Sequence, residues 1–343
     1  MILFRVDGNK IIGSGHVMRC LSIADAFRNV KQECCFAVAD DAFVNIIEQR
    51  GYKAIILGTD YRKMDDEISY LKKYIDELHI DRIIVDSYYV TREYLIALKT
   101  LVHVTYIDDL ASFAYPVDCI TNYNVYSKEL DYLGLYSGSN IEFPHLFFGL
   151  KYVPLRDEFK KTSCQKAPKK CKDVLISTGG ADPLHLALEM VRYIKEKAAF
   201  EYRYHFLIGA MNQDKKEIEE LVKGLENINL HINVTNMREL MCECDMAISA
   251  AGSTLYELCA CGVPTITYVL ADNQILGAKA FNAQGLMKSL GDIRICKNAP
   301  ERLFEAVKQL DADWVGRKSM SRRMQELVDG YGADRLVDEL LHV

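Results

Sequence analysis

The sequence predicts an α/β protein made of two Rossmann-like, doubly wound lobes with an interdomain cleft. Two observations lead to this prediction. Strand-like apolar runs alternate with helix-period segments along most of the chain, and the alternation lapses once, near the middle, before a second alternating set begins. Such alternation is typical of βαβ units in a parallel sheet, which bind ligands at the carboxyl ends of the strands. The 343 residues are enough for two domains of about 150 residues each.

The first lobe is expected over residues 1–155. Its strand-like runs are 2–6, 34–39, 53–57, 82–86 and 103–107, and helices are expected at Val17–Val30 and Asp65–Leu78. The pattern lapses over residues 111–155, which are rich in Tyr, Asn and Gly. Residues 156–172 then carry six lysines and no hydrophobic period, so a solvated interdomain linker is expected there.

The second lobe is expected over residues 173–343. Its strand-like runs are 173–178, 202–209, 228–234, 245–250 and 264–270, with helical stretches between them. A helical tail is expected from Arg317 to Leu341, interrupted at Gly330-Tyr331-Gly332.

Composition narrows the class of protein. Half of the chain is hydrophobic, 26% is charged and the net charge is −6, with no basic stripe that would suit nucleic acid. No apolar run approaches the roughly 18 residues of a spanning helix, and Asp7 interrupts the apolar start where a signal peptide would continue. We therefore expect a cytoplasmic protein that neither binds nucleic acid nor inserts into a membrane. The oligomeric state stays open.

Eleven cysteines are scattered through apparent core segments. An odd, scattered set favours reduced thiols over a disulfide framework. The pairs Cys242/Cys244 and Cys259/Cys261 lack a companion CxxC or a His cluster, so we expect packed small side chains there rather than a metal site.

The first candidate site is the turn that precedes the first helix. Gly13 and Gly15 run directly into His16, and a helix is expected to begin around Gly15 or His16. Unpaired amides and the positive end of the helix dipole favour binding of an anion there. A dinucleotide fingerprint would need a small residue where Met18 stands, although Asp40 after the second strand leaves NAD binding as a minor alternative.

His16 has two interpretations. Taken alone, a histidine at a helix start often caps its own turn or is merely exposed. Beside two glycines at a cleft edge, it suits a general base, because a positive helix end lowers the imidazole pKa and keeps the ring neutral near pH 7.

The second candidate site follows strand 245–250, in the string SAAGSTLYE. Ser253 and Thr254 offer hydroxyls and unpaired helix-start amides to a pyrophosphate. Glu257 lies one turn further on the same helix face, where a carboxylate suits the two hydroxyls of a ribose. A solvated helix glutamate is the alternative for Glu257 alone.

Two further turns follow strands of the second lobe. In ISTGGADP, Gly179 and Gly180 allow close backbone approach to a ligand, and Asp182-Pro183 predicts a helix start. In the Asp272-Asn273-Gln274 turn, amide side chains suit a sugar, and a helix cap is the alternative. For Gly179 and Gly180, the alternative interpretation is a plain tight turn.

Six segments together resemble the UDP-sugar hydrolases of pseudaminic acid biosynthesis and the similar spore coat polysaccharide proteins. The segments are FRVDGNKIIGSGHVMRCLSIA, DSYYV, FGLKYVPLRDEF, ISTGGADP, SAAGSTLYELCACGVPTI and DGYGADRLVDEL. They cover nearly the entire chain in a joint order that is more specific than any single motif. The family has the two-lobed GT-B architecture and is related to the peptidoglycan glycosyltransferase that transfers GlcNAc onto a lipid carrier. The chain departs from compact members by extra length in 120–172, and it carries no acetyltransferase-like extension.

The resemblance implies hydrolysis of UDP-2,4-diacetamido-2,4,6-trideoxy-β-L-altropyranose at the anomeric C–O bond, with neither a metal nor another cofactor. The catalytic histidine of the family falls on His16. Its nucleotide-binding segment falls on Ser253, Thr254 and Glu257, and sugar-facing positions match Tyr88 and Asn273. The predicted site consists of His16 as the catalytic residue, Gly13, Gly15, Tyr88 and Asn273 for the sugar, and Gly180, Ser253, Thr254 and Glu257 for UDP.

Three rival functions stay open. A GT-B glycosyltransferase that uses a UDP-amino sugar donor would need the same motifs, with a carbohydrate or lipid acceptor in place of water. A non-catalytic nucleotide-sugar-binding protein would bind the donor without releasing UDP. An epimerase of the UDP-GlcNAc type is also bilobed, but the His16 loop resembles the hydrolase more.

Overall fold

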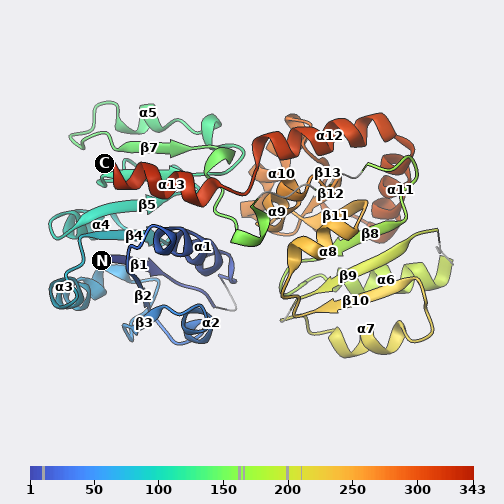
Figure 1. The fold of residues 1–343 in the computed structure, drawn as a ribbon, viewed down its shortest axis with the longest axis horizontal. Helices are drawn as coiled ribbons and strands as arrows, with labels where there is room; N and C mark the ends of the chain where they lie inside the picture. Colours follow the sequence, from blue (N-terminus) through green and yellow to red (C-terminus); the bar gives the residue numbers. More distant parts are fainter. Residues whose placement is uncertain (10–11, 161–163, 165–166, 198–200, 210) are drawn as a thin grey trace. The chain divides into compact units, whose positions relative to one another are not determined.

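The computed structural model describes residues 1–343 except 10–11, 161–163, 165–166, 198–200 and 210. The chain divides into unit 1, formed by Met1–Arg156 and Tyr331–Val343, and unit 2, formed by Asp157–Gly330 (Figure 1). Each unit contains a parallel sheet with helices around it. The predicted fold class, two Rossmann-like lobes, is confirmed.

The sheet of unit 1 has seven strands in the order β3-β2-β1-β4-β5-β6-β7, and every neighbouring pair is parallel. The central strands are near-continuous apolar runs, because helices cover both faces of such a sheet. The strands are β1 (Ile2–Val6), β2 (Cys34–Val38), β3 (Lys53–Ile56), β4 (Arg82–Asp86), β5 (His103–Ile107), β6 (Cys119–Asn122) and β7 (His145–Phe148).

The helices of unit 1 include the first and the last of the chain, which pack against each other. They are α1 (Gly15–Asn29), α2 (Val44–Gln49), α3 (Ile68–Glu77), α4 (Arg92–Lys99), α5 (Tyr132–Tyr136) and α13 (Gly332–Leu341), with short 3₁₀ turns at Met64–Glu67, Ser127–Glu129 and Leu150–Tyr152. The start of α1 at Gly15 confirms the predicted helix start.

The stretch 111–155, where the sequence pattern lapses, holds two strands that the pattern did not predict. β6 and β7 extend the sheet beyond β5, with α5 between them. Both strands are only four residues long, and β6 (CITN) ends in polar residues that are themselves buried. Periodicity cannot identify a strand this short.

The sheet of unit 2 has six parallel strands in the order β10-β9-β8-β11-β12-β13. The strands are β8 (Asp173–Ser177), β9 (Arg203–Ile208), β10 (Ile228–Ile232), β11 (Met246–Ala250), β12 (Thr265–Val269) and β13 (Lys288–Asp292). The last strand was not predicted, because KSLGD carries little apolar signal.

Seven helices accompany this sheet: α6 (Leu186–Lys197), α7 (Lys215–Leu221), α8 (Met237–Glu243), α9 (Thr254–Cys261), α10 (Ile275–Ala283), α11 (Ala299–Ala312) and α12 (Trp314–Leu327). Short 3₁₀ turns lie at Asp157–Phe159 (η4), Asp272–Gln274 (η5) and Ile293–Ile295. The predicted helical tail is present, with its interruption between α12 and α13.

The division of the chain differs from the predicted boundaries in two places. The expected lobe 173–343 does not include its own last helix, because α13 packs in unit 1 against α1 and the Leu150–Tyr152 turn (Figure 1). The expected linker 156–172 is not simply solvated. Phe159 is fully buried, and the guanidinium of Arg317 donates hydrogen bonds to the carbonyl oxygens of Pro168 and Lys169 at 2.6 and 3.3 Å.

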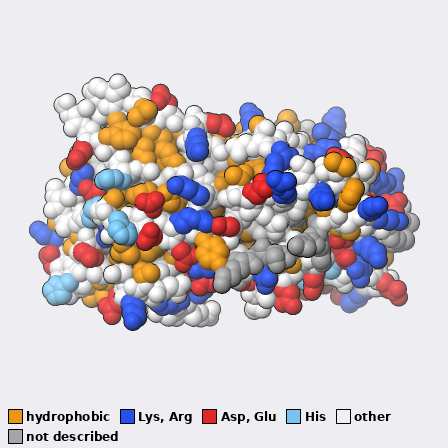
Figure 2. All heavy atoms as spheres, turned by 45° about the horizontal axis from the view of Figure 1, so that its top comes forward, with side chains coloured by type: hydrophobic (Ala, Val, Ile, Leu, Met, Phe, Trp, Pro, Cys, Tyr) orange, Lys and Arg blue, Asp and Glu red, His pale blue; other side chains and the backbone are white. Residues whose placement is uncertain are grey.

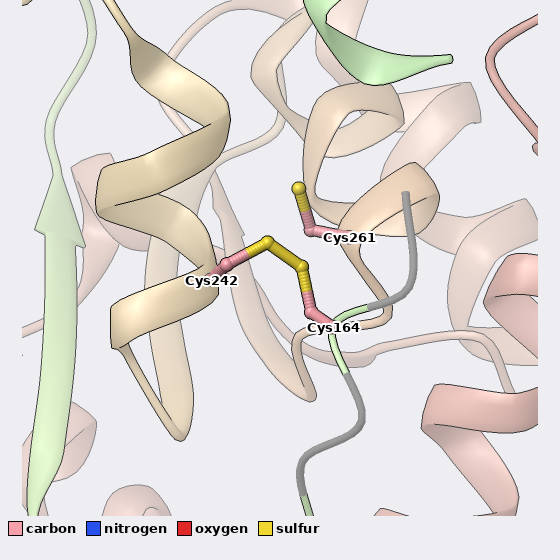
Figure 3. A group of neighbouring side chains, drawn as sticks. All are labelled: Cys164, Cys242 and Cys261. Atoms are coloured by element: carbon pink, nitrogen blue, oxygen red, sulfur yellow. A yellow bond between two sulfur atoms is a disulfide. The ribbon is translucent and has the colours of Figure 1, made fainter. Parts of the chain in front are cut away.

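The expectation that all cysteines are reduced and unpaired is wrong for two of them. Cys164 and Cys242, 78 positions apart in sequence, form a disulfide with their Cα atoms 5.4 Å apart (Figure 3). Their pairing depends on how the 157–172 segment meets α8, which cysteine spacing alone cannot show. The other nine cysteines lie outside this disulfide, and seven of them are buried.

No helix in the described part of the chain combines the length and apolarity that a membrane crossing needs. Figure 2 shows acidic and basic side chains interspersed on the face that it presents.

Candidate functional site

The first group of site residues gathers at the carboxyl edge of the unit 1 sheet. β1, β4 and β5 are neighbours in this sheet, so the residues that end or follow them lie side by side. The turn after β1 leads into α1, whose first turn carries His16. Asp86 is the last residue of β4, and Asp109 follows β5 by two residues.

His16 is buried and paired with a carboxylate. Its Nδ1 lies 3.2 Å from Asp86 Oδ1, and only 1% of the Asp86 side chain is exposed. Burial lowers the pKa of His16 below its ordinary value, and the nearby charge of Arg19 acts in the same direction, whereas Asp86 and Asp109 oppose it. The predicted direction of the shift is therefore confirmed, but its main cause is burial.

The position of Nδ1 beside Asp86 favours the tautomer that carries its proton on Nδ1. A neutral imidazole whose Nδ1–H donates to a carboxylate keeps its Nε2 lone pair available to accept a proton. This is the arrangement of a histidine base that is oriented by an acid.

Arg19, one turn beyond His16 on α1, holds the two acids in place. Its Nε and Nη2 each donate to Asp86 at 2.6 Å, and its Nη1 and Nη2 donate to Asp109 at 3.0–3.2 Å. Burial alone would raise the pKa of Asp109, but the charge and hydrogen bonds of Arg19 outweigh burial and the pKa is lowered. Two carboxylates therefore share one guanidinium in this cluster.

Sequence reasoning did not find Arg19, Asp86 or Asp109 as site residues. The signal was present: Asp86 and the Asp108-Asp109 pair each stand where a strand-like run ends, and the ends of neighbouring parallel strands meet. Arg19 lies three residues after His16 and so faces the same side of the helix.

Tyr88 lies beside His16, as the predicted sugar-facing position requires. The two rings pack edge to face with centroids 4.8 Å apart, and the Tyr88 hydroxyl donates to Asp109 Oδ2 at 2.9 Å. The Tyr88 side chain is nevertheless 40% exposed. Asn124 donates to Asp109 Oδ1 at 2.7 Å and completes the surroundings of this acid.

Gly13 and Gly15 shape the turn before His16. Gly13 has a φ of +83°, a left-handed conformation that favours glycine, and its amide donates to the carbonyl oxygen of Asn9 at 2.7 Å. An added Cβ at either glycine would meet no heavy atom of the described residues within 4 Å. Within the described residues, a side chain at either glycine would therefore meet no neighbour.

The second group lies at the carboxyl edge of the unit 2 sheet, at the start of α9. Ser253 is the N-cap residue of α9, is exposed, and makes no side-chain cap hydrogen bond within the described residues. Thr254 opens the helix, and Glu257 is half-buried in its first turn. Helix-start amides and two hydroxyls are thus placed together after β11, as predicted.

Gly180 follows β8, the strand next to β11. It is exposed, while its backbone packs closely on Gly209, where a Cβ would lie 2.3 Å from the Gly180 carbonyl oxygen. The predicted helix start at Asp182-Pro183 is displaced: α6 begins at Leu186. Asp182 instead caps this helix from a distance, accepting the amides of Leu186 and Ala187 at 3.0 and 2.9 Å.

Asn273 lies in the η5 turn after β12, which neighbours β11 on its other side. It is exposed, and the residue that caps α10 is Gln274, so Asn273 is not the helix cap. Because β8, β11 and β12 are adjacent and parallel, Gly180, the start of α9 and Asn273 share one edge of the unit 2 sheet.

The predicted residues thus form one group in each unit: Gly13, Gly15, His16 and Tyr88 in unit 1, and Gly180, Ser253, Thr254, Glu257 and Asn273 in unit 2. Among the described residues, the group of His, Cys, Asp and Glu side chains placed to hold a metal ion is Cys164, Cys242 and Cys261, which is separate from both.

Comparison with known proteins agrees with this division. Residues 174–331 match the glycosyltransferase family 28 C-terminal domain. This range covers nearly all of unit 2, including the start of α9.

Two relatives match across both units. The uncharacterized protein MJ1062 of Methanocaldococcus jannaschii is 28% identical over 280 residues, which is 78% of this chain and 55% of that protein. A Campylobacter jejuni protein named UDP-2,4-diacetamido-2,4,6-trideoxy-β-L-altropyranose hydrolase is 27% identical over 259 residues, covering 75% of this chain and 86% of that one. This chain thus spans about half the length of the first relative and most of the second.

The fold is that of known glycosyltransferases. The crystal structure of Acinetobacter baumannii MurG superposes with a TM-score of 0.71, covering 100% of this chain and 99% of that one at 14% identity.

Proposed function

We propose that the chain is an enzyme acting on a UDP-sugar, in the family of the UDP-sugar hydrolases and spore coat polysaccharide proteins. Its similarity to these relatives, the match of residues 174–331 to a glycosyltransferase domain and its glycosyltransferase-like fold support this proposal. The specific proposal is hydrolysis of a UDP-activated 2,4-diacetamido-2,4,6-trideoxy sugar to UDP and the free sugar. The observation that carries it is the buried His16–Asp86 pair beside an open glycine turn.

Water is the nucleophile in this proposal. His16 Nε2 accepts a proton as the water oxygen bonds to the anomeric carbon, and the bond from that carbon to the phosphate oxygen breaks. Its electron pair leaves with UDP. Asp86 accepts the Nδ1–H bond and stabilises the imidazolium that forms, while Arg19 fixes the orientation of Asp86.

A single base is sufficient for this reaction. Glycosidases normally use two carboxylates, one of them to protonate the leaving oxygen. UDP leaves as a stable anion and needs no such acid. In unit 2, the start of α9 binds the pyrophosphate through amides and the hydroxyls of Ser253 and Thr254, and Glu257 binds the ribose. Gly180 and Asn273 line the same edge, and no metal takes part in the chemistry.

The test is hydrolysis in ¹⁸O-labelled water without any acceptor. We expect UDP and free sugar in equal amounts, with the label on the anomeric oxygen of the sugar and none in UDP. EDTA leaves the initial rate unchanged. Label in the UDP phosphate would mean attack at phosphorus and would contradict the mechanism.

A glycosyltransferase is the second candidate, favoured by the match of residues 174–331 to a glycosyltransferase domain. In that reaction the His16–Asp86 pair would activate an acceptor hydroxyl in place of water. UDP release that requires an added glycan or lipid acceptor would establish this candidate and exclude the hydrolase.

A further inference from the structure

Three cysteine sulfurs converge in unit 2. The Sγ atoms of Cys164, Cys242 and Cys261 all lie within 4.8 Å of one another (Figure 3). They come from three separate parts of the unit: the segment after η4, the end of α8 and the last residue of α9. Cys261 is fully buried and Cys164 nearly so.

The disulfide between Cys164 and Cys242 accounts for two of these sulfurs and leaves the thiol of Cys261 beside them. A cross-link needs no third cysteine. Three thiols that converge from different elements instead match the donor set of a soft metal ion, which prefers thiolate ligands.

The spacing also suits such an ion. With metal–sulfur bonds of about 2.3 Å, the sulfurs around a tetrahedral Zn²⁺ lie about 3.8 Å apart. All three sulfurs are already within 4.8 Å, so opening the disulfide and small side-chain rotations bring them to that separation.

We propose that the reduced chain binds one thiophilic d¹⁰ ion, with Zn²⁺ as the reference case, through Cys164, Cys242 and Cys261. Two thiol molecules, which leave as a disulfide, or one phosphine with one water molecule, which leave as the phosphine oxide, supply the two electrons and two protons that break the S–S bond. The ion then displaces one proton from each of the three thiols, and these protons pass to water. The resulting site carries a net charge of −1.

A fourth ligand and a route of entry are both available from a pocket beside Cys164. This pocket has a volume of about 540 Å³, and its lining also includes Trp314, Lys318 and Arg322. Water from the pocket completes a tetrahedron. Lys318 places a positive charge in this lining, whereas Arg322 is paired there with Glu326 at 2.7 Å. The site lies about 12 Å along α9 from the helix start at Ser253, from the helical rise, and one turn beyond Glu257.

The function of the ion is to join the 157–172 segment to α8 and α9. Helices α8 and α9 pack against each other, and Glu257 of the proposed nucleotide site is one turn before Cys261 on α9. Metal binding therefore raises the thermal midpoint of the folded chain, because the ion binds the native arrangement and not the unfolded one.

The experiment uses the full-length chain, reduced with a phosphine under anaerobic conditions, loaded with Zn²⁺ or Co²⁺ and desalted. We expect one metal ion per chain by elemental analysis, and thiolate-to-cobalt charge-transfer absorption for Co²⁺. Cys242→Ser and Cys261→Ser each weaken Zn²⁺ binding by roughly tenfold or more, because each removes one of three ligands.

Cys259→Ser is the matched control, since Cys259 is equally buried on the same helix and outside the group. It should keep full metal binding, and circular dichroism checks that every variant is folded. A folded, reduced chain that binds no metal would overturn the proposal, as would equal loss in Cys259→Ser. Full binding in a folded Cys261→Ser chain would overturn it too. These readouts do not depend on the activity of the enzyme.

Discussion

A single imidazole nitrogen carries the proposed chemistry, so His16 is the first residue to test. Replacing His16 with Asn should lower kcat on the order of a hundredfold or more, the usual range for losing a general base. UDP affinity should hardly change, because the proposed nucleotide site is in unit 2. Turnover of UDP-sugar and calorimetry with UDP measure the two effects.

His103→Asn is the control for this change, because His103 begins β5 and so lies at the opposite edge of the sheet from the site. It should retain activity. Wild-type turnover in a folded His16→Asn protein would contradict the proposal that His16 is the general base.

Replacing Asp86 tests how the rate of the proposed reaction depends on pH. Catalysis needs neutral His16, so the rate falls as pH drops through the pKa of His16, which burial places below its ordinary value. The negative charge of Asp86 raises this pKa. Asp86→Asn should therefore move the acidic limb of the kcat/KM profile to lower pH and also reduce kcat, because the ring loses its orienting acceptor.

The pH profile separates a positioning role of Asp86 from a purely structural one. Asp60→Asn serves as control, since Asp60 is an acid paired with Arg62 near the surface of the same unit. An acidic limb that stays in place, or moves to higher pH, in a folded Asp86→Asn protein would contradict the role given to Asp86.

Sequence reasoning identified His16 because two glycines and a helix start mark it locally. It did not identify Arg19 or Asp109, which are 90 residues apart in sequence and meet only through the order of the strands. Tyr88 was found through family resemblance, and its contact with His16 is visible only once β4 and α1 are side by side. Local signals thus predict single residues, and contacts between strand ends need the topology.

At the scale of elements, the turn before α1 offers a matched pair of substitutions. Gly13→Ala places a Cβ at a φ of +83° and should destabilise the protein by about 1–2 kcal/mol. Gly15→Ala adds a Cβ into open space at a helical position and should leave the free energy of unfolding nearly unchanged. It should still raise KM if substrate approaches this backbone. Chemical denaturation and steady-state kinetics distinguish the two; an unchanged KM would remove Gly15 from the substrate site.

The first turn of α9 is the proposed UDP-binding element, and Glu257 is the residue that tests it. Glu257→Ala should weaken UDP binding by roughly 1.5–3 kcal/mol, because charged hydrogen bonds to the ribose are lost. Glu305→Ala, an exposed helix glutamate of the same unit, is the control and should have no effect. UDP affinity is measured by calorimetry, and unchanged affinity in folded Glu257→Ala would leave Glu257 without a role in binding.

Long apolar strands and the helix starts after them could be predicted from the sequence, as β1, β4 and β5 illustrate. Short strands could not, because β7 and β13 gain their stability from neighbours rather than from their own pattern. The displaced start of α6 has a similar cause: Asp182 accepts the Leu186 and Ala187 amides across the turn, which no local helix rule anticipates.

At the scale of the whole molecule, the last helix, α13, packs against the first, α1, and is expected to stabilise it. Leu340 on α13 is fully buried, whereas its neighbour Leu341 is 44% exposed. Leu340→Ala should cost about 2–5 kcal/mol of unfolding free energy and increase hydrogen exchange in α1, while Leu341→Ala should change little. Equal effects of the two substitutions, or exchange that increases in unit 2 instead, would contradict this coupling.

The return of α13 to unit 1 has a consequence for the order of protein synthesis. The ribosome makes β1 and α1 first, then all of unit 2, and only afterwards the helix that covers α1. At roughly 5–20 residues per second, the nascent first unit waits about 10 to 35 seconds with the packing surface of α1 uncovered. Unit 2 has a contiguous sequence and is complete before α13 emerges. The packing surface of α1 is therefore completed last, and a translating ribosome carries a chain that is able to fold unit 2 before unit 1 is complete.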